Sequence, residues 1–308
     1  TSRSMGNGRV ACSPIPEISA GRVTREVKQQ AEKPREYRIT PRYLANGDAN
    51  GSPAIQRLLD AGWALSRDEL ANTFVTAPDL RARLAFLPEG EDSTLWKISA
   101  GPDAFAPPQW LVTFDNRTPP EVVEDFTAAL AAAYAQGPEA YLGDGGRTSG
   151  ADTTLRLLAD GWRLDPATPF LSYQSPDRLI QFHQRDDPLR HEAEMAGDTE
   201  RWLFEVGPPR GVWYATASSR LPEHLLQTLT TAVTEPIPVN RYMRRVDLAH
   251  LPAVATATPT APSPLEVARV RAATSRSLSV PRTAPSALAY STTTHPPALP
   301  AASAGRSR

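Results

Sequence analysis

Cysteine is almost missing from this chain of 308 residues, and the one cysteine present, Cys12, lies near its N-terminal end. A single cysteine excludes an intramolecular disulfide and a zinc site made of several cysteines. No apolar run approaches the roughly 18 residues that span a bilayer, and the N-terminal stretch lacks the apolar segment of a signal peptide. We therefore expect a cytoplasmic protein without membrane contact.

Large apolar residues are scarce at both ends of the chain. The sequence has 31 prolines, and they crowd there beside alanine, serine and threonine. Such segments bury too little apolar surface to offset the entropy lost on ordering. We predict disordered tails at residues 1–36 and 252–308. Lysine is scarce too, since nearly all basic residues are arginine, and this bias indicates a GC-rich genome of the actinobacterial kind.

The net charge of −1 conceals an uneven distribution. Residues 1–36 carry a charge of +3 and residues 252–308 a charge of +5, which leaves 20 basic and 29 acidic groups in between. Affinity for nucleic acids comes mostly from Lys and Arg side chains that neutralise phosphates. The acidic middle is therefore a poor nucleic-acid binder, and any such contact would belong to the arginine-bearing tails.

The middle of the chain repeats itself at an offset near 100 residues. The recurring landmarks are Tyr43-Leu44 with Tyr141-Leu142, Gly62-Trp63 with Gly161-Trp162, Pro78-Asp79 with Pro176-Asp177, Trp96 with Trp202, Trp110 with Trp213, and Pro120-Glu121 with Pro222-Glu223. All six tryptophans fall into these pairs. Self-similarity of this kind indicates one domain written twice, and we place the two copies at residues 37–139 and 140–251.

Each copy is predicted to be an α+β unit. Helical spacing near 52–62 and 152–161 predicts a first helix, whose buried face in the second copy includes Leu155 and Leu158. Alternating apolar and polar residues then predict three or four antiparallel strands. Thr118 and Glu121 match a capping box that begins a last helix. Such a sheet buries one face under its helices, and we expect the two copies to share a surface across a pseudo-twofold axis.

The tripeptide Ser175-Pro176-Asp177, with the tryptophans and the Pro-Glu helix start that follow it, resembles the SPDY domain, a domain of unknown function common in streptomycetes. The resemblance covers both copies, at about residues 37–245. It departs from the motif where Arg178 and Leu80 replace the tyrosine and where Ala77 replaces the serine of the first copy. Pro78 and Asp79 then form the matching turn. The resemblance implies the duplicated fold and brings no known catalytic residue.

The tryptophans Trp63, Trp96, Trp110, Trp162, Trp202 and Trp213 allow two interpretations. A buried indole contributes several kcal/mol through the roughly 150 to 250 Å² it removes from water. We favour interior packing on this ground. The alternative is an exposed platform on which a ligand stacks.

The richest polar cluster is residues 183–194, in which His183, Asp186, Asp187 and His191 are possible metal ligands. We favour a solvated charged loop, because a loop does not fix the ligand geometry that a metal needs. The glycine-rich residues 143–150 predict a connection between the copies. The alternative there is a phosphate site at the start of the following helix.

No nucleophile-and-base motif is recognisable. We therefore predict a non-catalytic binding or adaptor protein, with no cofactor and no metal, whose partner is another protein. The alternative is a regulatory protein that contacts nucleic acid through its arginine-bearing tails. A third possibility is an enzyme that uses residues 183–194.

Overall fold

The computed structural model describes residues 34–45, 47, 51–88, 93–165, 170–261, 267, 268 and 271. Most of the two predicted tails lies outside these residues. The helices and strands given below belong to the first of the chain's two compact units, Thr1–Thr260. None of the helices in the described ranges is long and apolar enough to cross a membrane.

Each copy folds in the same order of helix, strands and helix. The first copy contains α2 (Ser52–Asp60), β2 (Ala64–Arg67), β3 (Thr73–Thr76), β4 (Ala82–Phe86), β5 (Thr94–Ala100), β6 (Trp110–Asp115) and α3 (Pro120–Gln136). The short helix α4 (Pro138–Leu142) leads to the second copy. That copy contains α5 (Ala151–Ala159), β7 (Arg163–Asp165), β8 (Leu171–Gln174), β9 (Ile180–Gln184), α6 (His191–Ala196), β10 (Trp202–Val206), β11 (Trp213–Ala217) and α7 (Glu223–Thr234). The predicted α+β class and the duplication are confirmed.

The predicted number of three or four strands per copy is too low, because each copy has five described strands. The outermost strands, β2 and β7, escape sequence analysis for a physical reason. Every residue of β2 is exposed, and β7 has 3 residues. Neither strand therefore shows the alternation that marks a half-buried strand.

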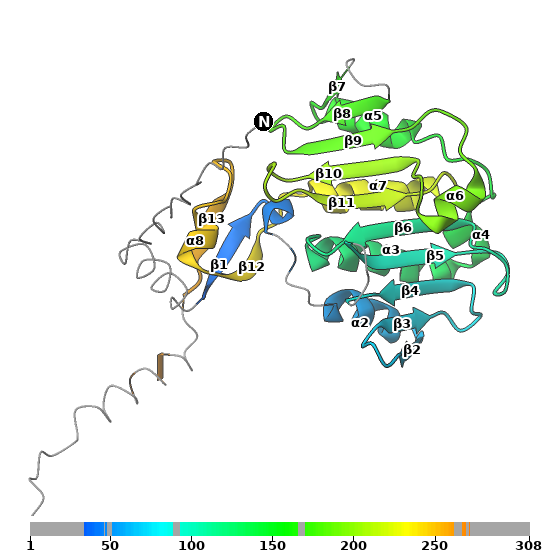
Figure 1. The fold of residues 1–308 in the computed structure, drawn as a ribbon, viewed down its shortest axis with the longest axis horizontal. Helices are drawn as coiled ribbons and strands as arrows, with labels where there is room; N and C mark the ends of the chain where they lie inside the picture. The colour runs from blue at the N-terminus through cyan, green and yellow to red at the C-terminus, as the bar shows by residue number, and fades with distance from the viewer. Residues whose placement is uncertain are drawn as a thin grey trace, which may run out of the picture. The chain divides into compact units, whose positions relative to one another are not determined.

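The strands of both copies form one antiparallel sheet in the order β2-β3-β4-β5-β6-β11-β10-β9-β8-β7 (Figure 1). The copies meet at its centre, where β6 pairs with β11 and Thr113 lies opposite Thr216. These two threonines occupy equivalent positions, and a hydrogen bond of 2.7 Å joins their hydroxyl oxygens. The local twofold axis therefore passes between them, and the copies join edge to edge.

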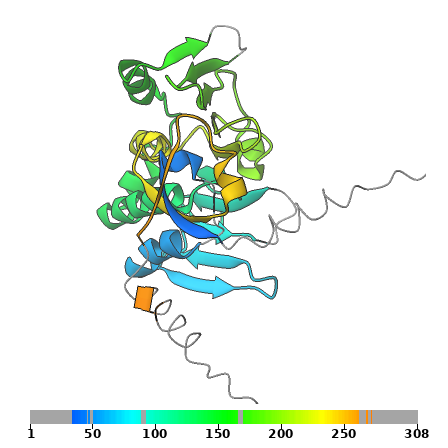
Figure 2. The same ribbon diagram turned by 90° about the vertical axis from the view of Figure 1, so that its left-hand side faces the viewer.

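Helices α2, α3, α5 and α7 cover one face of this sheet (Figures 1 and 2). The other face, which we call the front face, carries α6. The predicted alternation is confirmed in β5, where Trp96, Ile98 and Ala100 are buried against the helices. One continuous apolar core runs under both copies.

The predicted buried face of α5 is wrong by one position. Leu155 and Leu158 are exposed, whereas Leu157 is buried together with Thr153 and Thr154. Leu157 takes the place of Leu58 in α2, because each leucine carbonyl accepts a hydrogen bond from the backbone of the following tryptophan, Trp63 or Trp162. The two leucines that fit the helical spacing therefore lie on the surface.

The predicted capping box at the start of α3 is also wrong. Helix α3 begins at Pro120, and the Thr118 hydroxyl donates to Asp115 at 3.0 Å instead of capping the helix. The Glu121 carboxylate accepts two hydrogen bonds from Arg241, at 2.7 and 2.5 Å. A distant arginine is thus a better partner for Glu121 than the nearby backbone.

A second, smaller sheet extends into both predicted tails. It has the order β12-β1-β13, with β1 (Arg35–Thr40), β12 (Val239–Met243) and β13 (Thr256–Pro259). Ile39 of β1 is fully buried in the small core of this sheet. Long-range pairing supplies the hydrogen bonds that order residues 35–36 and 256–259, so the ordered part of the chain reaches beyond the predicted limits.

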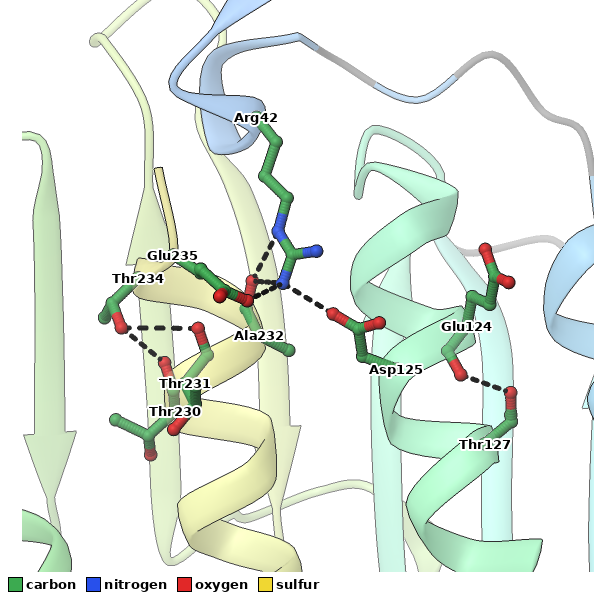
Figure 3. Close-up of polar contacts among 9 residues, drawn as sticks. All are labelled: Arg42, Glu124, Asp125, Thr127, Thr230, Thr231, Ala232, Thr234 and Glu235. Carbon is green, nitrogen blue, oxygen red and sulfur yellow. Dashed lines mark hydrogen bonds and ion pairs between the residues drawn. The ribbon is translucent and has the colours of Figure 1, made fainter. Parts of the chain in front are cut away.

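Arg42, in the short 3-10 helix Arg42–Leu44, fixes the start of the first copy to the ends of other elements (Figure 3). Its Nε and Nη2 atoms donate to the carbonyl oxygen of Ala232, at the end of α7, at 3.0 and 2.6 Å. Nη2 also lies 2.6 Å from Asp125 of α3 and 3.6 Å from Glu235. The positively charged guanidinium donates hydrogen bonds at the C-terminal end of α7, where carbonyl oxygens lack helical partners and the helix dipole is negative.

Candidate functional site

The Pro-Asp dipeptides form tight turns at the same place in both copies. In the second copy, the backbone N of Arg178 donates to the carbonyl oxygen of Ser175 at 2.9 Å, between β8 and β9. In the first copy, Leu80 makes the same bond to Ala77 at 2.9 Å, between β3 and β4. The prolines Pro78 and Pro176 of these turns are exposed.

The serine of the Ser-Pro-Asp tripeptide stabilises the second turn. Its hydroxyl, on Ser175, donates to Asp177 at 2.5 Å and accepts from the backbone N of Ile180 at 2.9 Å. Asp177 also accepts from the backbone N of Leu179 at 3.1 Å. Ala77 has no hydroxyl, so the first turn is built without these two side-chain bonds.

The aspartates of the two turns hold the copies together. The hydroxyl of Tyr43, which precedes the first copy's α2, donates to Asp177 of the second copy. The hydroxyl of Tyr141, which precedes the second copy's α5, donates to Asp79 of the first copy at 3.2 Å. The tyrosine of each copy thus donates a hydrogen bond to the turn aspartate of the other copy. We call these two contacts, Tyr43 with Asp177 and Tyr141 with Asp79, the crossed clasps.

Burial and the aspartate charge both act on the clasp tyrosines. Burial raises the pKa of the Tyr43 phenol, and its hydrogen bond to Asp177 raises it further. Burial followed by the charge of Asp79 raises the pKa of Tyr141 to about 12. Both phenols therefore stay protonated at neutral pH and act as hydrogen-bond donors with a structural task.

The tryptophans are interior residues that extend the crossed clasps. All six indoles are buried: Trp63, Trp96, Trp110, Trp162, Trp202 and Trp213. The Trp213 indole N–H donates to the carbonyl oxygen of Tyr43 at 2.9 Å, and that of Trp110 donates to Tyr141 at 2.8 Å. A buried ring offers no stacking surface to a ligand, so the indoles fill the core and position the tyrosines.

Residues 183–194 are not the solvated loop predicted from the sequence. The segment begins on β9 and ends in α6, and Glu194 is 4% exposed. The four possible metal ligands are spread along it, with His183 on β9, Asp186 and Asp187 in the connection and His191 at the start of α6. Among the described residues, the structure brings together no three His, Cys, Asp or Glu side chains that could hold a metal.

Helix α6 is folded onto the front face by polar contacts. Glu194 accepts from the backbone N and the hydroxyl of Ser219, at 2.7 and 2.8 Å. An imidazole nitrogen of His191 lies 2.9 Å from the carbonyl oxygen of Pro108 in the first copy. These long-range bonds decide the helical structure here, and the sequence gives no local signal for them.

Glu194 belongs to a buried polar network that also contains Arg201. The Arg201 side chain is 1% exposed; its Nε donates to the Ser219 hydroxyl at 3.2 Å and its Nη2 to the carbonyl oxygen of Asp187 at 3.0 Å. Burial followed by the charge of Arg147 lowers the pKa of Arg201. The network is specific to the second copy, because Leu95 stands where Arg201 does, one residue before the paired tryptophan.

A cavity of about 140 Å³ adjoins this network on the front face. Its wall includes Phe170, His183, Arg185, Glu200, Arg201 and Glu205. Burial lowers the pKa of the His183 imidazole and, for Glu200, raises the pKa of the carboxyl. The sequence marks His183 as a possible ligand but does not group it with the other lining residues, because they come from separate segments of the chain.

The glycine-rich residues 143–150 do not form a phosphate site at α5. The carboxylate of Glu223 already accepts from the backbone N of Gly150 at 2.9 Å, and from the backbone N and hydroxyl of Thr153 at 3.3 and 2.9 Å. A carboxylate there satisfies the helix start as an anion would. The segment is a connection, as the sequence predicts.

Exposed leucines gather at the outer end of the second copy. Leu164 of β7 is 49% exposed and Leu171 of β8 is 40% exposed. Leu164 pairs with Tyr173, which packs in the core, so both leucines lie on the helix-covered face. They are joined there by Leu155 and Leu158 of α5.

The flank of α5 that carries its two leucines faces away from α7. Thr153 bonds to Glu223 and marks the flank toward α7. At about 100° per residue, Leu155 and Leu158 lie about 200° and 140° around the helix from Thr153. They therefore point toward the uncovered ends of β7 and β8. The four residues Leu155, Leu158, Leu164 and Leu171 are named the leucine surface below.

The comparisons with known proteins find the duplicated unit. The model of the SPDY family, a domain of unknown function (DUF317), matches residues 76–135 and again residues 174–239. Searches of curated proteins and of solved structures found no match. Both matched regions run from the Pro-Asp turn to the long last helix, and the second also includes α6. Two tandem regions of this chain therefore match one family model, in agreement with the duplication seen in the fold.

Proposed function

We propose that the protein is a non-catalytic module that binds another protein through the leucine surface of its second copy. The observation that carries this proposal is the exposure of four leucines at one end of the sheet: Leu155 is 64%, Leu164 49%, Leu158 43% and Leu171 40% exposed. Clustered apolar side chains on a surface mark sites where another macromolecule docks.

The first copy supports this interpretation as an internal comparison. Gln56 of α2 stands where α5 has Leu155, because Leu58 and Leu157 are equivalent. Thr73 of β3, which is 5% exposed, stands where β8 has Leu171, because strand pairing makes their neighbours equivalent. The fold is thus built without a leucine at these two positions, so packing does not explain Leu155 and Leu171. Leu158 and Leu164, in contrast, have leucine counterparts in the first copy, Leu59 and Leu65.

A protein partner suits this surface better than a small molecule does. Leucines on a helix flank and two short strands form an open surface, whereas small-molecule sites are concave. Covering a half-exposed leucine contributes about 1 kcal/mol. The whole surface therefore supplies a useful part of a protein–protein affinity, with polar contacts at its rim supplying specificity.

A photo-reactive amino acid tests the proposal in the full chain. We would place it at position 155 in one sample and at the equivalent position 56 in another, irradiate cells, and identify the adducts by mass spectrometry. One protein should be attached at 155 and not at 56. Equal adducts at both positions, or none at 155, would contradict the proposal.

The identified protein then allows a quantitative test. Its affinity for the chain should fall about tenfold or more with Leu155→Gln combined with Leu164→Gln, since about 1 kcal/mol is lost at each position. The matched control is Leu65→Gln, which changes a leucine of the first copy that is 40% exposed. An equal loss in the control would show that the leucine surface is not the binding site.

The alternative function rests on parts of the chain outside the described residues. Most of the two arginine-bearing tails lies there. Binding of nucleic acid through them would weaken steeply with salt and would disappear when both tails are removed.

A further inference from the structure

We infer that the front-face cavity of the second copy is a binding site for the carboxylate group of a small molecule, held by Arg201 and His183. This site is separate from the leucine surface, which lies on the helix-covered face. The inference therefore stands or falls independently of the proposed protein partner.

Two buried hydrogen-bonding atoms lack partners at this cavity. Nη1 of Arg201 and Nε2 of His183 are buried and have no hydrogen-bond partner among the described residues. Both residues line the cavity. The other His183 nitrogen, Nδ1, lies 2.7 Å from the Ser172 hydroxyl, and a proton on Nε2 follows when Ser172 donates to Nδ1. One unsatisfied donor, joined by a second when Ser172 donates to Nδ1, lies beside one small space and calls for an acceptor.

The first copy shows that the fold does not require these polar groups. The backbone N of Arg185 donates to the carbonyl oxygen of Arg201 at 2.9 Å, and Leu87 and Leu95 make the equivalent bond at 2.7 Å. Ala85 is the counterpart of His183, because each lies two residues earlier on its strand. The same backbone therefore accepts apolar residues, and leaving a guanidinium nitrogen unpaired costs stability without a structural gain.

The outer wall of the cavity is partly open, whereas its inner wall is buried. The side chains of Arg185 and Glu200 are 29% and 27% exposed, and their charged groups lie 3.6 Å apart. The Arg185 guanidinium also stacks 4.9 Å from the centre of the Phe170 ring. A ligand can enter beside these three side chains and reach the donors behind them.

Size and charge select a carboxylate over larger or more highly charged groups. The cavity of about 140 Å³ is small, which suits a compact group such as a carboxylate. Glu200 and Glu205 also line it, so a dianion such as phosphate would be repelled more strongly than a monoanion. A guanidinium and a carboxylate match in shape and form short, charge-assisted hydrogen bonds.

The test is a titration of the full chain with acetate at neutral pH, followed by nuclear magnetic resonance shifts of backbone amides. Chloride keeps the ionic strength constant. Acetate should bind saturably and shift signals of β9 and β10. Phosphate and the neutral isostere acetamide are titrated in parallel and should bind more weakly than acetate.

Two substitutions introduce into the second copy the residues that the first copy has at the same positions, and they should therefore leave the fold intact. Arg201→Leu reproduces Leu95 and His183→Ala reproduces Ala85, and each should weaken acetate binding about tenfold or more. The matched control is Arg83→Leu, which removes one positive charge from an exposed residue of β4. It should leave acetate affinity unchanged.

Several results would overturn the inference. These are the absence of saturable acetate binding to the native chain, equal affinity in Arg201→Leu, and an equal loss in Arg83→Leu. Stronger binding of phosphate than of acetate would show that the site binds a phosphate group and not a carboxylate. Equal binding of acetamide would show that charge plays no part.

Discussion

The two copies of this protein share a scaffold and differ in how they use its surface. The clasp tyrosines, the turn aspartates and the tryptophans are present in both copies, and the tyrosines meet the aspartates across the junction. At some equivalent positions the copies differ: the second copy has Arg201 where the first has Leu95, and Leu155 where the first has Gln56. Duplication thus separates positions that the fold needs from positions that are free to specialise.

One matched pair shows how equivalent residues take different tasks. Glu223 caps its own copy's helix α5, whereas Glu121 pairs with Arg241 of β12. Burial alone would raise the pKa of Glu121, but the hydrogen bond and charge of Arg241 outweigh it and lower the pKa. Glu121 therefore joins the first copy to the small sheet, whereas Glu223 makes its bonds within the second copy.

The largest expected difference between the copies lies at the glycines before the first helices. A Cβ on Gly150 would lie 2.1 Å from the Trp202 ring, at a φ of +67°, whereas a Cβ on Gly51 would lie 3.1 Å from Trp96 at an ordinary φ. Gly150→Ala should lower the free energy of unfolding by about 3 kcal/mol, and Gly51→Ala by about 1 kcal/mol or less. Urea denaturation measures both, and equal losses would remove the distinction.

The contributions of the two crossed clasps to the free energy of unfolding should also differ, by a smaller amount. Asp177 is half-buried and Asp79 is exposed, so an aspartate oxygen that loses its donor is harder for water to reach in the second copy. Tyr43→Phe should cost about 2 kcal/mol of stability and Tyr141→Phe about 1 kcal/mol. The measurement is again denaturation of the full chain. A larger loss with Tyr141→Phe would reverse this ranking of the clasps.

Replacing the positive-φ residue of either turn by glycine should change the stability of the protein by the same amount. Leu80 and Arg178, which replace the family's tyrosine, have φ values of 63° and 65°. Side chains other than glycine are strained there by about 1 to 2 kcal/mol, and glycine costs about half of that in the unfolded chain. Leu80→Gly and Arg178→Gly should each stabilise the protein by about 0.5 to 1 kcal/mol. Thermal unfolding of both variants checks this, and a lower melting temperature in either would show that its side chain is needed.

The smallest expected effect is a pH dependence confined to the second copy. Burial lowers the pKa of His183 below its ordinary value of about 6.5. The folded chain then binds fewer protons than the unfolded chain between the lowered pKa and about pH 6.5, so its stability falls as pH drops through this window. His183→Gln should reduce this loss. Denaturation at several pH values between 5 and 7.5 measures it, and parallel curves for both proteins would exclude His183 as a cause.

Patterns of spacing along the chain predict much of the scaffold. The duplication, the strands β4 to β6 and the apolar stripes of α3 and α7 follow from repeated landmarks and from periods of 2 and 3.6 residues. The apolar residues at helical spacing that begin at Val122 and at Leu225 are buried against the core. Such patterns are reliable where a long element buries one side against a single large core.

The candidate sites depend on contacts that spacing does not encode. Leu155 and Leu158 fit a helical stripe as well as Leu157 does, and the bond between Thr153 and Glu223 decides which flank turns inward. The sequence marks His183 as notable but gives no sign that Arg201 lies beside it. Proximity across strands is set by register, and register depends on the whole sheet.

The amino-acid sequence by itself determined that one α+β unit occurs twice, because six pairs of scarce or turn-forming residues recur at nearly constant spacing. Tertiary structure alone decided that the copies exchange their tyrosines, that their sheets fuse at β6 and β11, and that the polar cavity belongs to the second copy. The physical reason is that local patterns report which side of an element is apolar. Which distant groups meet is decided by the packing of the complete chain.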